Sequence, residues 1–144
     1  MHAPLDERVG RWLSQAQDDL EASTVLRERT PHLACFHAQQ CGEKALKALL
    51  TRLTGDSVPT HELERLLEAI NGVLPDVPEA IRTPARSLDK YYVPTRYPDA
   101  LGFANAALAF TSADVDSASE TARAVVEWCW SEIELARRRD PNPP

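Results

Sequence analysis

Five polar side chains recur within residues 37–47 and could together bind a phosphate-bearing ligand. They are His37, Gln40, Glu43, Lys44 and Lys47. Lysine supplies positive charge, histidine and glutamine supply directional hydrogen bonds, and glutamate can pair with the lysines. At about 100° per residue of an α-helix, the five residues lie on one face. The pattern is typical either of a ligand-binding face or of a solvated outer face that Glu43 and Lys47 support by i, i+4 pairing.

The same stretch carries an apolar face opposite these polar residues, which is typical of a helix packed against a core. Pro31 suits the first turn of a helix, where its missing N–H costs nothing, and Gly55 suits a helix end. The sequence therefore predicts a helix over residues 31–53. The apolar face consists of Cys35, Ala38, Gly42, Ala45, Leu46, Leu49 and Leu53.

Four other segments show the three- and four-residue spacing of apolar side chains that is typical of amphipathic helices. The first covers residues 6–28. The second is a short helix for which Thr60 is the predicted cap, and the third follows Pro78. The last is a long helix that begins at Asp114. Its predicted apolar stripe is Val115, Ala118, Ala122, Val125, Val126, Cys129 and Ile133.

The pattern of the whole chain predicts its fold class. No segment alternates apolar and polar residues as a half-buried strand would, and no repeat of fixed period is present. The prediction is an all-α fold, an antiparallel up-and-down bundle of about four to five helices. Residues 1–139 are expected to form a single domain, and the proline-rich tail at 140–144 is expected to be disordered.

The chain is acidic, with 22 Asp and Glu against 16 Lys and Arg and a formal charge of −6. This charge repels a phosphate backbone, so any contact with a nucleotide or nucleic acid must be a local patch. No run of about 18 apolar residues occurs, and Asp6 and Glu7 stand where a secretion signal would be basic. We therefore expect a cytoplasmic protein without a membrane span.

The three cysteines are typical of reduced thiols in a protein core. Cys35, Cys41 and Cys129 form no CxxC pair and fall in apolar stretches. Cys35 and His37 project to opposite sides of the predicted helix, so one zinc ion could not bind both. We expect neither a metal site nor a cofactor.

Four motifs lie along the central helix and the segments after it. They are Gln39-Gln40-Cys41-Gly42-Glu43-Lys44, Thr60-His61-Glu62-Leu63, Tyr91-Tyr92 and Thr95-Arg96-Tyr97-Pro98-Asp99. Together they resemble the HEPN family. The resemblance extends over residues 9–136, nearly the whole chain, and its most specific part is the combination of Gln-Gln-x-x-Glu-Lys with Arg-Tyr-Pro-Asp. It implies a bundle of four or five helices, often a homodimer. It also implies a nucleotidyltransferase-associated module, encoded beside a minimal nucleotidyltransferase whose nucleotide or other substrate it would hold, as in a toxin-antitoxin-like pair.

The residues and the resemblance together predict a non-catalytic binding pocket. Cationic side chains would hold phosphate charge, tyrosine rings would pack on a base or ring face, and His37 and Gln40 would supply directional hydrogen bonds. Glu43, His61 and Asp99 are expected to support the pocket, with Glu43 paired to its cations. The predicted ligand-binding residues are His37, Gln40, Lys44, Lys47, Tyr92, Arg96 and Tyr97.

The alternative function is a metal-independent ribonuclease, because some HEPN proteins are ribonuclease toxins. Their signature is an arginine followed after four to six residues by a histidine, which moves a proton while the arginine steadies the phosphate. No histidine follows Arg96 at that spacing, and the match of Arg27 to His32 spans a predicted helix junction. This alternative therefore requires that folding bring His37 or His61 close to Arg96.

Two apolar residues of the last helix predict self-association. Trp128 and Leu135 project away from its main apolar stripe, one heptad apart. A second apolar seam has no use in an isolated bundle, so it is expected to be buried in a symmetric homodimer.

Overall fold

A computed structural model describes residues 3–92 and 109–141 of the chain. Within these residues it contains five α-helices and one short 3₁₀ helix, and no strand. The prediction of an all-α bundle of four to five helices is confirmed. The elements are α1 (Leu5–Val25), α2 (Pro31–Thr54), α3 (Leu63–Asn71), α4 (Glu79–Ser87), the 3₁₀ helix η1 (Leu88–Tyr91) and α7 (Ser112–Arg139).

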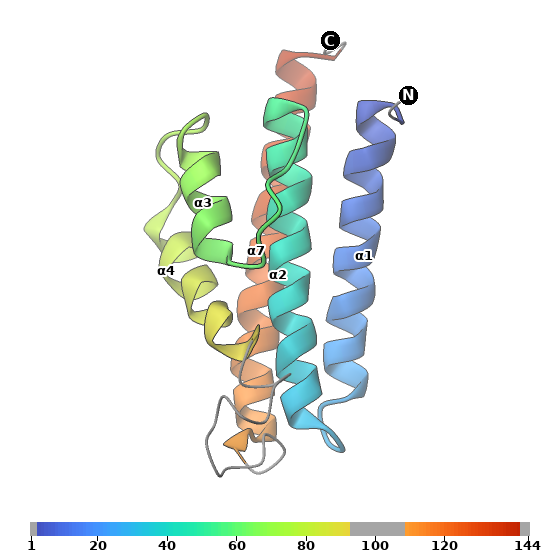
Figure 1. The fold of residues 1–144 in the computed structure, drawn as a ribbon, viewed down its shortest axis with the longest axis vertical. Helices are drawn as coiled ribbons and strands as arrows, with labels where there is room; N and C mark the ends of the chain where they lie inside the picture. Colours follow the sequence, from blue (N-terminus) through green and yellow to red (C-terminus); the bar gives the residue numbers. More distant parts are fainter. Residues whose placement is uncertain (1–2, 93–108, 142–144) are drawn as a thin grey trace.

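Helix α2 lies at the centre of the bundle and packs against α1, α3 and α7 (Figure 1). Helices α1 and α2 run antiparallel, joined by a short turn. The segment after α2 returns along the bundle before α3 begins, so α3 and α4 form a short antiparallel pair beside α2 and α7. As a result α2 and α7 run in the same direction, and α1 stands on the opposite flank from α3 and α4.

The central position of α2 decides how its polar residues are buried. The interpretation of residues 37–47 as a solvated face is wrong for Glu43 and Lys47, which are only 2% and 8% exposed. His37, Gln40 and Lys44 are half-buried. Because α2 is covered on nearly all sides, these polar side chains must find partners within the protein.

The ends of the helices agree in part with the sequence prediction. Gly55 ends α2 with a φ of 88°, a left-handed conformation that favours glycine. Thr111 caps α7 in a reciprocal capping box with Asp114. Thr60 does not cap α3; instead the Asp89 carboxylate accepts hydrogen bonds from the backbone N–H groups of the first turn. The predicted helix over residues 6–28 is shorter, and it ends at Val25.

Most of the core comes from α1, α2, α3 and α7, with contributions from α4 and η1. Every residue of the stripe predicted for α7 is buried. The three cysteines are free and buried as predicted. Burial raises the pKa of Cys35 and Cys41 to about 12.

None of the helices in the described part of the chain combines the length and the hydropathy that a membrane span requires.

The outer side of α7 differs from the prediction at one of its two apolar positions. Trp128 is half-buried and packs against the protomer's own core, so the expectation that it projects away from the core is wrong. Leu135 is 39% exposed, as expected of a surface residue.

Candidate functional site

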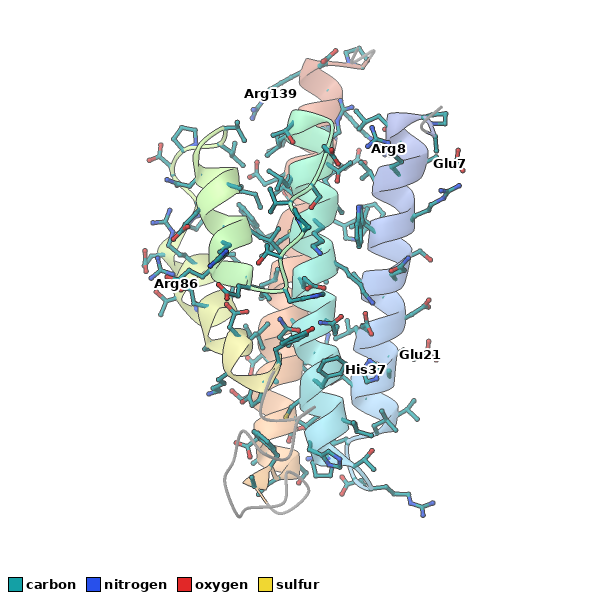
Figure 2. All side chains as sticks on the ribbon, viewed as in Figure 1. Glu7, Arg8, Glu21, His37, Arg86 and Arg139 are labelled. Carbon is teal, nitrogen blue, oxygen red and sulfur yellow. The ribbon has the colours of Figure 1, made fainter. Side chains whose placement is uncertain are left out.

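The first polar cluster joins α1 to α2 and consists of Asp19, His37 and Lys44; we call it the Asp19 cluster. Asp19 Oδ1 lies 2.8 Å from His37 Nδ1, and Asp19 Oδ2 accepts a hydrogen bond of 2.6 Å from Lys44 Nζ. Burial by itself raises the pKa of Asp19, but the hydrogen bonds from His37 and Lys44 and their charges together outweigh it, so the pKa is lowered. The carboxylate is therefore held ionised between two donors. His37 lies between α2 and α1 (Figure 2).

The second polar cluster joins α2 to the segment before α3 and consists of Glu43, Lys47 and His61; we call it the Glu43 cluster. Glu43 Oε1 lies 2.7 Å from His61 Nδ1 and 3.9 Å from Lys47 Nζ. Lys47 also lies over the Trp12 ring, 5.3 Å from its centroid. The prediction that Glu43 pairs with cations is thus confirmed for Lys47, although its nearest partner is His61.

The two glutamines of the motif hold the same segment in place. Gln39 is fully buried, and its Nε2 donates a 2.7 Å hydrogen bond to the backbone carbonyl of His61. Gln40 Nε2 donates in turn to Gln39 Oε1 at 2.7 Å. His61 is therefore fixed to α2 both by its backbone and by its imidazole. This anchoring explains why two consecutive glutamines are useful at the middle of a buried helix.

A row of four rings, which we call the aromatic row, connects the two clusters. His61 stacks on Tyr92 with a centroid distance of 4.9 Å and an interplanar angle of 13°. Tyr92 contacts Phe36 at 5.9 Å, and Phe36 contacts His37 edge-on at 5.6 Å. Both ends of the row are thus histidines whose Nδ1 faces a buried carboxylate. Such a carboxylate favours a proton on Nδ1, and Nε2 of a neutral imidazole is then the acceptor nitrogen.

Close packing around Gly42 allows α3 and η1 to approach α2. A Cβ atom added at Gly42 would lie 2.8 Å from Leu63 Cδ2 and 3.1 Å from Leu88 Cδ1. Both leucines are buried, so they have little room to move. Glycine is therefore needed at position 42 because it leaves room for Leu63 and Leu88, and not because of its backbone conformation. The close approach brings the start of α3 and the end of η1, where Tyr92 follows, to the same side of α2.

A cavity of about 510 Å³ opens beside the His61 end of the aromatic row. His61 and Tyr92 line it, and its volume is within the range of small-molecule sites. Pro59 and Thr60 also line it, together with three acidic residues, Glu62, Glu64 and Asp89. Burial raises the pKa of Asp89, although its hydrogen bonds to the α3 backbone oppose this. The cavity therefore offers a flat ring surface, and its acidic rim disfavours phosphate at this particular position.

The structure brings together some of the predicted site residues and separates others. Tyr92 and His61 line the cavity, while His37 and Lys44 lie on the α1 side of α2 in the Asp19 cluster. Lys47 is buried against Trp12. Arg96, Tyr97 and Asp99 lie outside the described residues. The ribonuclease alternative, which requires Arg96 close to His37 or His61, therefore stays a prediction.

Three residues of the site are absent from the predicted set. Asp19, Gln39 and Phe36 organise the two clusters and the aromatic row. Helical projection could have signalled Asp19, because it falls on the inner face of α1 between buried Ala16 and Ser23. A buried carboxylate at such a position needs a cationic partner on a neighbouring helix.

Comparison with known proteins identifies the family. A model of the HEPN domain matches residues 9–134 of the chain. The crystal structure of TT1696 from Thermus thermophilus is 35% identical in sequence and has a TM-score of 0.78, and the match covers 87% of this chain and 98% of that one. ST0689, an archaeal HEPN homologue, is 34% identical with a TM-score of 0.72, and the match covers 88% and 98% of the two chains. No protein of curated function gives a significant match. The chain belongs to the HEPN family.

Proposed function

We propose that this HEPN protein is a non-catalytic module that binds a nucleotide or another phosphate-bearing substrate for a minimal nucleotidyltransferase. The two proteins would act in the cytoplasm as a toxin-antitoxin-like pair, and the module itself would be a homodimer. The aromatic row with its two carboxylate-paired histidines is the observation that carries the proposal. Aromatic faces next to directional hydrogen-bond donors and acceptors are what a planar base or ring requires.

The base or ring would pack at the His61 end of the aromatic row. The stacked pair of Tyr92 and His61 lines the 510 Å³ cavity, which is large enough for a ring system. The acidic rim formed by Glu62 and Glu64 would favour the amino groups of a base over its phosphates. The phosphates would therefore extend away from this rim.

The phosphates would lie on the Lys44 side of the row. Lys44 is half-buried and its partner is Asp19, so an incoming phosphate would compete with that carboxylate for the ammonium group. Arg96 is proposed as the second cation. Lys47 would act indirectly, because it is buried over Trp12 and pairs with Glu43, the residue that holds His61.

The proposal is tested by calorimetric titration of the purified chain with ATP, AMP and the other common nucleotides. Lys44→Ala should weaken binding about tenfold to a hundredfold, because a charge-assisted contact is lost. Arg29→Ala is the matched control, since Arg29 is an exposed cation in the turn between α1 and α2. Its affinity should equal that of the wild type.

Two results would contradict the proposal. One is the absence of binding by every nucleotide tested at millimolar concentration. The other is metal-independent cleavage of RNA in the presence of a chelator, abolished by Arg96→Ala and by His37→Ala or His61→Ala, which would establish the ribonuclease instead. A small nucleotidyltransferase encoded beside this chain, and purified together with it, would support the proposed partner.

A further inference from the structure

A second cavity, of about 360 Å³, lies between the N-terminal half of α1 and the C-terminal end of α2. From α1 it is lined by Arg8, Arg11, Trp12 and Gln15, which follow one another at helical spacing along a single face. It shares no residue with the aromatic row or the two polar clusters. Its volume lies at the lower end of the range for small-molecule sites.

The positive charge of Arg8 faces this cavity without an acidic partner. Its Nη1 donates to the carbonyl of Gly55 at 2.8 Å and its Nε donates to the carbonyl of Ala3 at 3.1 Å, and both acceptors are neutral. Among the described residues, no carboxylate oxygen lies within 4.0 Å of an Arg8 nitrogen, the distance that defines an ion pair. Figure 2 shows Arg8 directed from α1 toward α2 and Glu7 directed outward. Arg8 is thus positioned by the backbone with its charge left for another anion.

Arg11 adds a second guanidinium at the rim. It pairs with Glu7, but the two side chains are 64% and 49% exposed, and such surface pairs contribute little. A bound oxyanion could therefore replace Glu7 at small cost. Asp56 is the acidic residue among those that line the cavity, so the lining carries more positive than negative charge in a chain whose total is −6.

Two hydroxyl groups of the lining residues lack hydrogen-bond partners. Thr51 Oγ1 and Ser57 Oγ are both buried, and neither has a partner within the described part of the chain. Buried hydroxyls are normally satisfied, so two beside one cavity indicate a position adapted to polar atoms. Trp12 supplies an aromatic surface, a half-buried indole beside the arginines.

We propose that this cavity binds a small aromatic oxyanion, with Arg8 and Arg11 holding its phosphate or carboxylate group and Trp12 packing on its ring. Arginine forks match the geometry of both oxyanions, and an indole is a favourable surface for a planar ring. The cavity shares no lining residue with the nucleotide site proposed at the aromatic row, although Lys47 of the Glu43 cluster lies over the Trp12 ring.

The indole N–H signals of the full chain in ¹H–¹⁵N spectra provide a direct test, because the three tryptophans report separate places. Phenyl phosphate and benzoate are the two probes, because each carries both an oxyanion and an aromatic ring. Inorganic phosphate, which has only the oxyanion, and phenol, which has only the ring, are the controls. The Trp12 signal should shift saturably with one or both aromatic oxyanions, and phenol and inorganic phosphate should bind at least about tenfold more weakly. Trp128 and Trp130, both on α7, should not move.

Substitutions at Arg11 link any binding to the proposed geometry. Arg11→Gln should weaken the tighter oxyanion about tenfold, Arg11→Lys should restore part of the affinity, and Arg29→Gln should have no effect. Both positions are exposed, so thermal melting should confirm an intact fold in all three variants. Absence of saturation at 10 mM with both aromatic oxyanions, equal affinity for inorganic phosphate, or full affinity in Arg11→Gln would overturn the proposal.

Discussion

Asp19 determines how the polar side chains between α1 and α2 are held. It is 7% exposed, and it is the shared acceptor of His37 and Lys44. Without the Asp19 carboxylate, His37 and Lys44 would lose their shared acceptor. Leaving a partly buried donor unsatisfied costs more free energy than a hydrogen bond contributes. A single carboxylate on α1 therefore fixes the orientation of two predicted ligand-binding residues on α2.

Asp19→Asn should reduce the free energy of unfolding by about 1.5–3 kcal/mol at pH 7, because hydrogen bonds to a charged acceptor are replaced by weaker ones. The lowered pKa of Asp19 means that its ionised form is favoured in the folded state. Its contribution is therefore fully present above about pH 4 and is lost as pH falls through the lower folded-state pKa. Urea denaturation between pH 3 and pH 7 measures the difference between variant and wild type.

Asp18→Asn is the control for this experiment, because it removes the same charge from the exposed neighbouring position. It should change stability by no more than about 0.5 kcal/mol. Equal losses in Asp18→Asn and Asp19→Asn, or a loss in Asp19→Asn that does not shrink in acid, would show that the Asp19 cluster does not stabilise the protein as described.

At the scale of elements, the contact of α3 and η1 with α2 decides whether the site is assembled. Gly42 permits this contact, and Asp89 of η1 caps α3 from outside the helix through the backbone N–H groups of Leu63 and Glu64. Helix α3 has nine residues, too few to be stable alone. Its position therefore depends on packing and on the cap that η1 supplies.

Two glycine substitutions separate packing from helix propensity. Gly10 lies in α1 with open space around its added Cβ, so Gly10→Ala should stabilise the protein by about 0.5–1 kcal/mol. Gly42→Ala gains the same propensity but must displace two buried leucines, which costs about 1–3 kcal/mol. Denaturant unfolding should therefore give a higher free energy of unfolding for Gly10→Ala than for the wild type, and a lower one for Gly42→Ala. If both variants gain equally, the contact of α3 with α2 is looser than the structure indicates.

At the scale of the whole molecule, the predicted homodimer places the outer side of α7 in its interface. Leu135 remains exposed on α7, whereas Trp128 is partly engaged in the protomer's core. A substitution at Trp128 would therefore disturb the protomer's core as well as the interface, and its effect on folding could not be separated from its effect on dimer dissociation. Leu135 is the better position at which to test the interface.

Light scattering of the wild type should give about twice the 16.0 kDa of one chain. Leu135→Glu should shift the mass toward the monomer while the far-ultraviolet dichroism stays helical, because an apolar contact worth roughly 1.5–3 kcal/mol occurs twice in a symmetric interface. Val25→Glu, a similar change at a 74% exposed residue of α1, should leave the mass unchanged. A wild type that is monomeric at micromolar concentration would show that this seam is not an interface.

The features that depend on local periodicity and on motifs could be predicted from the amino-acid sequence. These are the all-helical fold, the extent of α2, the buried stripe of α7, the buried thiols and the family. Apolar spacing determines which face of one helix is buried, and proline and glycine mark its ends whatever the rest of the chain does.

The packing of the helices against one another determines which polar residues come into contact. Asp19 reaches His37 and Lys44 because α1 packs along one side of α2, and His61 reaches Glu43 because the segment after α2 returns along the other side. The helical period of α2 placed its polar residues on one face but could not show that neighbouring elements cover that face. Burial of a helix on nearly all sides is a property of the elements around it, and their arrangement is not encoded in the spacing of its own residues.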